Sequence, residues 1–561
     1  MPIAENALVE CVPNFSNGRD PEVIRAITDA IETVAGITLL DVDPGDATNR
    51  TVVTLVGSPA DAVEAAFRGI QAAQKSIDMQ NHSGAHPRMG ATDVCPFVPV
   101  SGIDMQGCAQ LAAQLGERVG KELGIPVFLY ERAATQPERA NLATVRQGEY
   151  EGLQAKLQDP EWSPDFGPSA WSESIARSGA TVIGARPFLV AYNVNLNTKN
   201  TRKAMKIAAL VREKGIIRRE KGEIVRDADG NAVRDPGMFK CVKGIGWFIE
   251  EYDCCQVSIN FTDHTVSAIH DVVDAIRRVA DKEGVVVTGS ELVGLIPLEC
   301  MVNAGRHYLT RQGLNPGAPE AELVQVAIRS LGLDDLKPFD PNQAIIERRI
   351  RTDGDLVKLT CRDFTDLLSS SSPAPGGGSV AALCGAMATG LAAMVGSLTT
   401  GKKGYEEQWQ AMDEMAIAAQ ELREAYLTDV DADTDAFNQI MAAFALPNKS
   451  DDEKKARETA IKTATLNATD VPLRVLERTN LALDCIETAL MGNKNARSDA
   501  GVAALTAWAC AEGAWYNVCI NLQGLKDKTV THVYKVRADT ALTQVTERVQ
   551  DISDRVRSEL G

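Results

Sequence analysis

The sequence predicts a multidomain protein in which two α/β or α+β units precede an all-α helical domain. Its 561 residues exceed what one hydrophobic core usually organises. Strand-like and helix-like segments alternate up to about residue 336. After Thr360, strand signals almost vanish, and Ala, Leu, Glu, Lys and Arg recur at helical spacing. These features favour helices packed on a sheet, followed by a helical bundle.

The first α/β unit is predicted over residues 1–186. The strand-like run LVECVPNF precedes a helix whose isoleucines share one face, and ITLLDVD and RTVVTLVG follow as strands. Ser58 and Pro59 then supply a cap and a first-turn proline for a helix that reaches about Ile77. The strand VCPFVPV, a helix over about 105–123 and the strand PVFLY complete the alternation.

The second unit is predicted over residues 187–336. It contains, in order, the strand FLVAYNVNL, a helix over about 200–214, the strands FKCVKGIGWFIEE and CQVSINFTD, a helix over about 266–281 and the strand VVVTG. The similar element order predicts a similar architecture, although no clear sequence repeat is visible. Prolines and turn formers in LKPFDPN indicate a linker over 337–359, and the helical domain should span 360–561.

The composition disfavours several classes of partner. A formal net charge of −18 opposes non-specific attraction to nucleic acid or anionic lipid. The 12 cysteines include no CxxC pair, so we expect reduced thiols and a cytoplasmic location. The first residues lack the basic start and apolar run of a signal peptide. Residues 380–398 carry no charge but are mostly small, so we expect a buried helix of a soluble domain and no membrane insertion.

The segment HSGAHPRMGATDVCPF holds two of the six histidines, on a loop that enters the strand VCPFVPV. Histidine is the side chain best suited to proton transfer near neutrality. Arg88 could hold a carboxylate in a forked pair, and Asp93 could orient an imidazole. Two other interpretations stay open. The histidines could bind zinc, although a proline and no obvious third ligand argue against it, or they could simply satisfy loop backbone groups.

Three glycines, Gly376 to Gly378, stand before Ser379 at the start of a predicted helix. Exposed amides and the helix dipole there could hold an anion or a polar ring edge. The GxxxxGK[ST] pattern of a nucleotide-phosphate loop is absent. A purely structural turn into a closely packed helix is the alternative.

Four acids recur at every second position of TDVDADTDAF. A calcium loop would need a glycine at its sixth position and an acid at its twelfth, and neither register supplies them. On a helix, Asp429 and Asp433 share one face while Asp431 lies almost opposite, so at least one acid can point inward. The alternative is a solvated acidic helix face.

Many separate stretches resemble one family. VECVPNFSNGRD, LLDVDPGDATNRTVVTLVG, HSGAHPRMGATDVCPFVPV, DFGP, GATVIGARPFLVAYNVNLNT, VKGIGWFIEE and GSELVGLIPLECM are similar, in order, to the formiminotransferase half of the formimidoyltransferase-cyclodeaminase family. APGGGSVAA, LTTGKK, VDADTDAF, GNKNARSD and YNVCINL follow the order of its cyclodeaminase domain. The resemblance covers residue 9 to about 336, and residue 360 to near the end.

The resemblance implies a bifunctional enzyme of histidine degradation. It would move a formimidoyl group from N-formimidoyl-L-glutamate to tetrahydrofolate, then cyclise the product to 5,10-methenyltetrahydrofolate and release ammonia. The implied transferase has two ferredoxin-like α+β subdomains with folate in a crevice between them. The family's catalytic histidine matches His86, with His82 the less favoured candidate, and its catalytic acid in the second domain matches Asp433.

The resemblance also implies a folate-binding stretch, whose alternative interpretation is a connection between the two subdomains. The matching residues are Gly167, Pro168, Ser169, Ala170, Trp171, Ser172, Glu173, Ser174, Ile175, Ala176, Arg177, Ser178 and Gly179. Second-site folate contacts would fall on Gly376, Gly377, Gly378 and Ser379. The segment 492–499 could line the same pocket or join two helices, and Lys402 and Lys403 could attract the glutamate tail of folate or be solvated.

The cofactor implied is tetrahydrofolate, as carrier and co-substrate in polyglutamylated form, with no metal. Fusion of two consecutive activities suggests that the tail holds the intermediate near the second site. The family further implies homo-oligomers, as dimers or a ring of dimers, in which the helical domain pairs across a two-fold axis.

Overall fold

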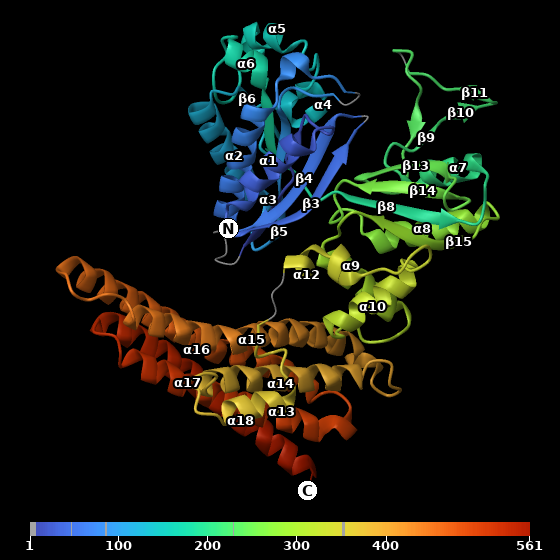
Figure 1. Cartoon of the computed structure of the whole chain (residues 1–561). Helices are drawn as coiled ribbons and strands as arrows, with labels where there is room; N and C mark the ends of the chain where they lie inside the picture. Colours follow the sequence, from blue (N-terminus) through green and yellow to red (C-terminus); the bar gives the residue numbers. More distant parts are fainter. Residues whose placement is uncertain (1–6, 47, 85–86, 228, 351–353, 561) are drawn as a thin grey trace. The chain divides into compact units, whose positions relative to one another are not determined.

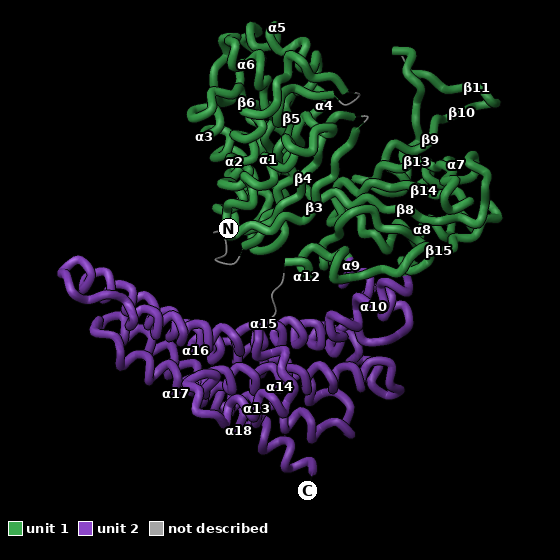
Figure 2. Tube along the Cα trace, viewed as in Figure 1, with its two compact units in different colours: residues 1–300, 331–351 green, residues 301–330, 352–561 purple. Residues whose placement is uncertain are grey.

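The computed structural model describes residues 7–46, 48–84, 87–227, 229–350 and 354–560. Contacts divide the chain into two compact units (Figure 2). One consists of residues 1–300 and 331–351, and the other of residues 301–330 and 352–561.

The first subdomain is built on a mixed, seven-stranded sheet. Its strands are β1 (Leu8–Cys11), β2 (Asn14–Phe15), β3 (Ile37–Gly45), β4 (Arg50–Gly57), β5 (Thr92–Ser101), β6 (Val127–Glu131) and β7 (Thr181–Ala185). The helices α1 (Pro21–Glu32), α2 (Pro59–Ser76) and α3 (Met105–Arg118) cover one face. β1, β4, β3 and β5 pair antiparallel, whereas β7 joins β5 and β6 in parallel. The order β1-α1-β3-β4-α2-β5 is a ferredoxin-like βαββαβ unit.

Local signals explain where these helices begin. The Asp20 side chain accepts the first amides of α1, and Ser58 Oγ accepts the amide of Asp61 at the start of α2. A proline occupies the first position of both helices. The predicted start of the helix after Ser58 is therefore confirmed.

The strand β1 places a carboxyl group inside the protein. Val9 and Cys11 join the core beneath the helices, so Glu10 between them points to the opposite face of the sheet. Its side chain is 3% exposed. Burial raises the pKa of Glu10 to about 7, opposed by the charge of Arg186 and reinforced by that of Glu347. The folded protein therefore holds a proton on Glu10 that the unfolded chain releases near pH 4.5.

We expect Glu10→Gln to remove a pH dependence of stability. Between pH 4.5 and about 7 the folded state binds one more proton at Glu10 than the unfolded state, so the free energy of unfolding falls as pH rises. Over this pH range the free energy of unfolding of the parent should fall by about 3 kcal/mol relative to that of the glutamine variant. Urea denaturation of both proteins across this range measures it. Parallel pH profiles of the two proteins would contradict the buried, protonated state.

The second subdomain has the same element order on a smaller sheet (Figure 1). It comprises β8 (Val190–Leu196), α7 (Thr201–Val211), β13 (Val242–Ile249), β14 (Cys254–Phe261), α8 (Ile269–Lys282) and β15 (Val287–Val293). The strands form an antiparallel sheet in the order β13-β14-β8-β15. This is again the ferredoxin-like arrangement, so the predicted similarity of the two units is confirmed.

Several short elements were not predicted. Two small ribbons lie between α7 and β13. They pair β9 (Ile216–Ile217) with β12 (Arg234–Asp235), and β10 (Arg219–Glu220) with β11 (Glu223–Ile224). The residues assigned to the linker include α11 (Pro341–Ala344) and α12 (Ile346–Ile350). Each of these elements is at most five residues long, too short for a periodic sequence signal.

The helices α9 (Leu298–Arg311) and α10 (Glu320–Leu331) follow β15. By contacts, residues 301–330 group with the helical domain, whereas the predicted ranges assign them to the second subdomain. Asn315 between the two helices explains this grouping, because its Nδ2 donates to Thr400 Oγ1 at 2.9 Å. The backbone at Gly317 also packs against Ala416.

The helical domain contains six α-helices within the part of it that the structure describes. They are α13 (Cys361–Leu368), α14 (Gly377–Ser397), α15 (Trp409–Phe444), α16 (Asp451–Ala489), α17 (Arg497–Leu522) and α18 (Lys528–Leu560). α14 is long and apolar enough to cross a membrane by length and composition alone. It packs against α15, α16 and α17, and Tyr426 lies against its Gly385. Its position is that of a core helix, as its small residues predict.

Candidate active sites

The histidine loop precedes β5, as predicted. His86 lies outside the described residues. His82 Nε2 lies 3.1 Å from the Asn49 carbonyl oxygen, to which it donates, and Nδ1 accepts from Arg88 Nε at 3.1 Å. Burial lowers the pKa of His82, and the neighbouring Arg88 adds to this shift while the Asn49 contact opposes it. A neutral ring with both nitrogens engaged is suited to holding the loop and leaves no nitrogen for proton transfer.

Arg88 does form the expected forked pair, but with a carboxylate of the chain itself. Its Nη1 and Nη2 donate to the two oxygens of Glu151 at 2.8 and 2.7 Å, and Glu149 lies 3.4 Å away. The suggestion that Asp93 orients an imidazole is not supported for His82. Asp93 accepts the Met89 amide at 3.0 Å and pairs with Arg146. Arg88 and Asp93 therefore anchor the described residues that follow His86 in the sequence.

An open cavity of about 470 Å³ lies beside this loop. It is lined by His82, Ser83, Gly84, Arg88, Gly148, Glu149 and Glu151. Four of these residues, His82, Ser83, Gly84 and Arg88, lie within four positions of His86 in the sequence. Polar and charged groups dominate the lining, which suits a small, charged substrate better than an apolar one.

The predicted folate-binding stretch, residues 167–179, lies within the first subdomain between β6 and β7. The interpretation as a connection between subdomains is therefore wrong, since β7 returns to the first sheet. Gly167 and Gly179 both have positive φ, and their backbones touch neighbouring backbone where a side chain would not fit. The middle forms α6 (Glu173–Ser178), which exposes Glu173 and buries Ile175. Its exposed residues, and not its buried ones, are available to a ligand.

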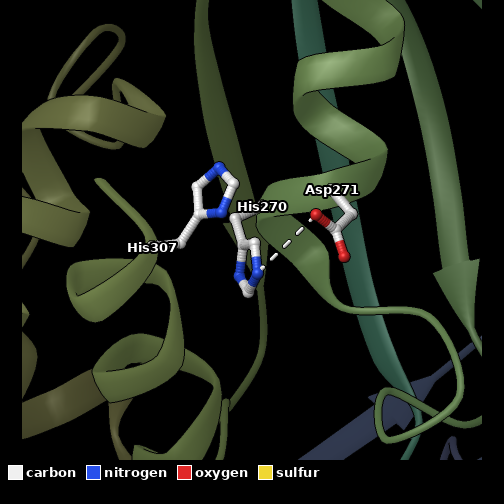
Figure 3. A group of neighbouring side chains, drawn as sticks. All are labelled: His270, Asp271 and His307. Carbon is white, nitrogen blue, oxygen red and sulfur yellow. Dashed lines mark ion pairs between the residues drawn. The ribbon is translucent and has the colours of Figure 1, made fainter. Parts of the chain in front are cut away.

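Two further histidines, His270 and His307, lie on helices. His270 is buried at the start of α8, and its Nε2 lies 3.8 Å from Asp271 Oδ1 (Figure 3). His307 on α9 stacks edge-on against Tyr308 with ring centroids 5.0 Å apart.

The glycine turn and the acidic segment meet, as the proposed second site requires. Ser379 Oγ, at the first turn of α14, donates to the Val430 carbonyl oxygen at 2.8 Å and to Asp433 Oδ2 at 3.4 Å. The Ser379 amide also hydrogen bonds to the Asp433 carboxylate. The group held at this helix terminus is thus the carboxyl of Asp433. Gly376 and Gly377 remain beside it for other contacts.

Asp433 has the electrostatics of a proton donor. Burial raises its pKa above the usual value, the hydrogen bonds from Ser379 oppose the shift, and the nearby Asp429 charge reinforces it. A half-buried carboxyl with a raised pKa retains its proton at higher pH than an exposed one. Such a group can protonate a leaving amine.

The other acids of the segment have different roles. Asp429 is 2% exposed and pairs with Arg474 and Arg478. Asp431 accepts the Leu356 amide at 2.8 Å and so anchors the chain before α13. Asp435 is exposed. The prediction that at least one acid points inward is confirmed, but the solvated interpretation holds for Asp435.

We expect Gly378→Ala to damage this site selectively. A Cβ at Gly378 would overlap the Asp433 carboxylate, so the acid must leave Ser379 or α14 must shift. Gly390→Ala, further along the same helix, is the matched control, because a Cβ there meets only Arg423 Cδ, at 4.0 Å. Cyclisation of 5-formimidoyltetrahydrofolate should fall about 100-fold in the first variant, the loss expected for a catalytic group displaced by ~1 Å. Equal rates in the two variants would contradict the placement of Asp433.

Asn517 on α17 lies beside the glycine turn, and the sequence did not single it out as a candidate. A Cβ at Gly377 would lie 3.5 Å from Asn517 Nδ2, so this carboxamide borders the same glycine turn as Asp433. The segment YNVCINL supplied the signal, since an asparagine within an apolar helix face is typical of an inward polar contact.

Segment 492–499 and Lys402 lie together at the opposite end of α14. Lys402 Nζ donates to Asn493 Oδ1 at 2.6 Å, and the Asn493 amide donates to Thr399 Oγ1 at 2.9 Å. Within one chain, the length of α14 separates these groups from Asp433, by about 30 Å for 21 residues. The structure therefore does not bring them into the pocket suggested by the sequence.

The chain matches three protein-family models. Residues 8–186 match the formiminotransferase domain, N-terminal subdomain, and residues 191–351 match the formiminotransferase domain. Residues 360–540 match formiminotransferase-cyclodeaminase.

Curated relatives cover the whole chain or one half of it. Formimidoyltransferase-cyclodeaminase of Dictyostelium discoideum is 41% identical over 553 residues, 98% of each chain. Glutamate formimidoyltransferase of Thermoplasma acidophilum is 41% identical over 55% of this chain and 95% of its own length. Methenyltetrahydrofolate cyclohydrolase of Methylorubrum extorquens is 37% identical over 36% of this chain and 98% of its own length. By its match along almost the full length of a bifunctional relative, the chain belongs to the formimidoyltransferase-cyclodeaminase family.

Proposed function

We propose that this chain is a bifunctional folate enzyme of histidine degradation. It transfers the formimidoyl group from N-formimidoyl-L-glutamate to tetrahydrofolate, and then cyclises 5-formimidoyltetrahydrofolate to 5,10-methenyltetrahydrofolate. The observation that carries the proposal is the half-buried Asp433 carboxyl, with its raised pKa, at the start of α14 in a chain that also carries the transferase half.

In the first step, a ring nitrogen of tetrahydrofolate attacks the formimidoyl carbon and the bond to the glutamate nitrogen breaks. The attacking nitrogen loses a proton and the departing nitrogen gains one. We assign this exchange to His86, because an imidazole can take up and release protons near neutrality. The flanking loop, held by His82 and Arg88, would support it.

In the second step, N10 of the folate attacks the formimidoyl carbon and closes the five-membered ring. The former imino nitrogen leaves as ammonia after accepting the proton that Asp433 supplies. Because that nitrogen starts with one hydrogen, it also takes up the proton released by N10, and Asp433 regains its proton from solvent. The carbon–nitrogen double bond that forms gives the methenyl cation.

One assay tests both steps together. The full-length protein is incubated with N-formimidoyl-L-glutamate and tetrahydrofolate, while methenyl-folate absorbance and ammonia are followed. One ammonia per methenyl group is expected. Methenyl-folate formed with N-formylglutamate as donor, without ammonia, would instead indicate a formyltransferase.

We propose that the folate is polyglutamylated and that its tail keeps the intermediate near the second site in a cytoplasmic enzyme. A tether raises the effective concentration at the second site without new contacts. Long-tailed folate should release less 5-formimidoyltetrahydrofolate into solution than the monoglutamate. Equal release from both would remove this part of the proposal.

We further propose that the helical domain pairs with a second copy. α17 exposes large apolar residues along one face, which favours burial against a partner. They are Val502, Leu505, Trp508, Tyr516 and Ile520. Trp508→Glu should reduce the mass of the assembly in sedimentation, because a buried unpaired charge is unfavourable at an interface. An unchanged mass would exclude this face from the contact.

A further inference from the structure

Two arginines of α16 share one buried carboxylate in the helical domain. Arg474 Nη2 lies 2.6 Å from Asp429 Oδ1, and its Nε lies 2.7 Å from the same oxygen. Arg478 Nη1 pairs with Asp429 Oδ2. Asp429 is 2% exposed, whereas the side chain of Arg474 is 44% exposed. The carboxylate is therefore an internal support that holds a guanidinium at the surface.

The side chains of Arg474, Arg478 and Asp429 together carry a net charge of +1. Two guanidinium groups meet one carboxylate, and both carboxylate oxygens are already engaged. Arg474 Nη1 has no hydrogen-bond partner among the residues that the structure describes. A guanidinium of this kind, fixed on one edge and open on the other, presents paired donors to an external carboxylate.

The cluster lies next to the proposed cyclodeaminase acid. Asp429 and Asp433 are four residues apart on α15, so they lie one turn apart on one face, about 6 Å along the axis. Asp433 contacts Ser379 of α14, and Asp429 contacts α16. A folate carries its reacting nitrogens at one side of a benzoyl ring and its glutamate carboxylates at the other. Along α15, the proposed acid Asp433 and the Asp429–Arg474 pair likewise lie one after the other.

We propose that Arg474, positioned by Asp429, binds a glutamate carboxylate of the folate whose formimidoyl group is cyclised at Asp433. The inference rests on the proposed cyclodeaminase function and adds to it the residue that recognises the anionic end of the substrate. Arg478 adds a second positive charge at Asp429, and its guanidinium lies over the Tyr426 ring, 5.1 Å from the ring centroid.

The test compares two arginine-to-glutamine variants of the full-length protein. Arg474→Gln removes the proposed contact. Arg537→Gln is the matched control, because Arg537 has a similarly exposed side chain, at 49%, and a forked pair with Glu477. Cyclisation is measured with 5-formimidoyltetrahydrofolate and with 5-formimidoyltetrahydropteroate, which lacks the glutamate.

We expect Arg474→Gln to raise KM for the folate about 10- to 100-fold, the loss of a charge-assisted contact, with little change in kcat. KM for the pteroate should stay the same in this variant, and Arg537→Gln should change neither. Equal effects of Arg474→Gln on both substrates would overturn the proposal. If the glutamine variant does not fold, Arg474→Lys replaces it, since lysine keeps the charge but not the forked contact. The ratio of KM for the pteroate to KM for the folate must still be lower in this variant than in the parent. Failure of the unaltered protein to cyclise either substrate would count against the proposed function itself.

Discussion

Asp433→Asn is expected to abolish cyclisation while leaving formimidoyl transfer unchanged. Asparagine keeps the size of the side chain but cannot supply a proton to the departing nitrogen. General acid catalysis by a positioned group contributes about 100- to 10,000-fold, and kcat should fall by that amount. The first site lies in another compact unit, so its chemistry does not require this carboxyl.

The measurement is the appearance of 5,10-methenyltetrahydrofolate from added 5-formimidoyltetrahydrofolate. Asp435→Asn is the matched control, because Asp435 is exposed on the same helix two residues further on. The control should retain the parental rate. A similar loss in both variants would show that the charge of the segment, and not the position of Asp433, sustains the reaction.

His86→Ala should have the reverse effect. Without an imidazole, the glutamate nitrogen departs without a proton donor, and transfer from N-formimidoyl-L-glutamate should fall about 100- to 10,000-fold. Cyclisation of added 5-formimidoyltetrahydrofolate should continue at the parental rate.

His532→Ala serves as the control for His86→Ala, since His532 is exposed on α18. Transfer is measured as the glutamate released from N-formimidoyl-L-glutamate, and thermal unfolding verifies that the variant is folded. Parental transfer by a folded His86→Ala protein would exclude His86 as the proton carrier and redirect attention to Glu149 in the neighbouring cavity.

Much of the fold follows from local sequence. The cap at Ser58 and the proline after it mark the start of α2, because both act within one turn. The alternating segments of the second unit likewise yield β8, α7, β13, β14, α8 and β15 in order, since each is long enough to show its period. Loss of strand signals after Thr360 predicts α13 to α18.

The contacts that define the second site could not be read in this way. Helical spacing identified the shared face of Asp429 and Asp433, but not which acid each neighbour would engage. Asp429 forms ion pairs with two arginines of α16. Asp433 accepts a hydrogen bond from Ser379, which is more than 50 residues away in sequence. Such pairings depend on how helices pack, which a single amphipathic pattern does not specify.

The loop around His82 shows the same limit. Its residue types suggested a carboxylate-binding arginine, and Arg88 does bind one, but the partner is Glu151 at a distance of 63 residues. Only the structure shows that both nitrogens of His82 are occupied. The sequence therefore locates the site, and tertiary contacts decide which of its groups remain available.

A mixing experiment tests most directly whether one chain carries two separate proton-transfer sites. His86→Ala and Asp433→Asn proteins are each given N-formimidoyl-L-glutamate and the monoglutamate form of tetrahydrofolate, whose intermediate can pass through solution, alone and together. Neither variant alone should produce methenyl-folate, whereas the mixture should produce it with one ammonia per methenyl group, because one protein makes the intermediate that the other cyclises. A mixture of folded variants that stays inactive would contradict the two-site account.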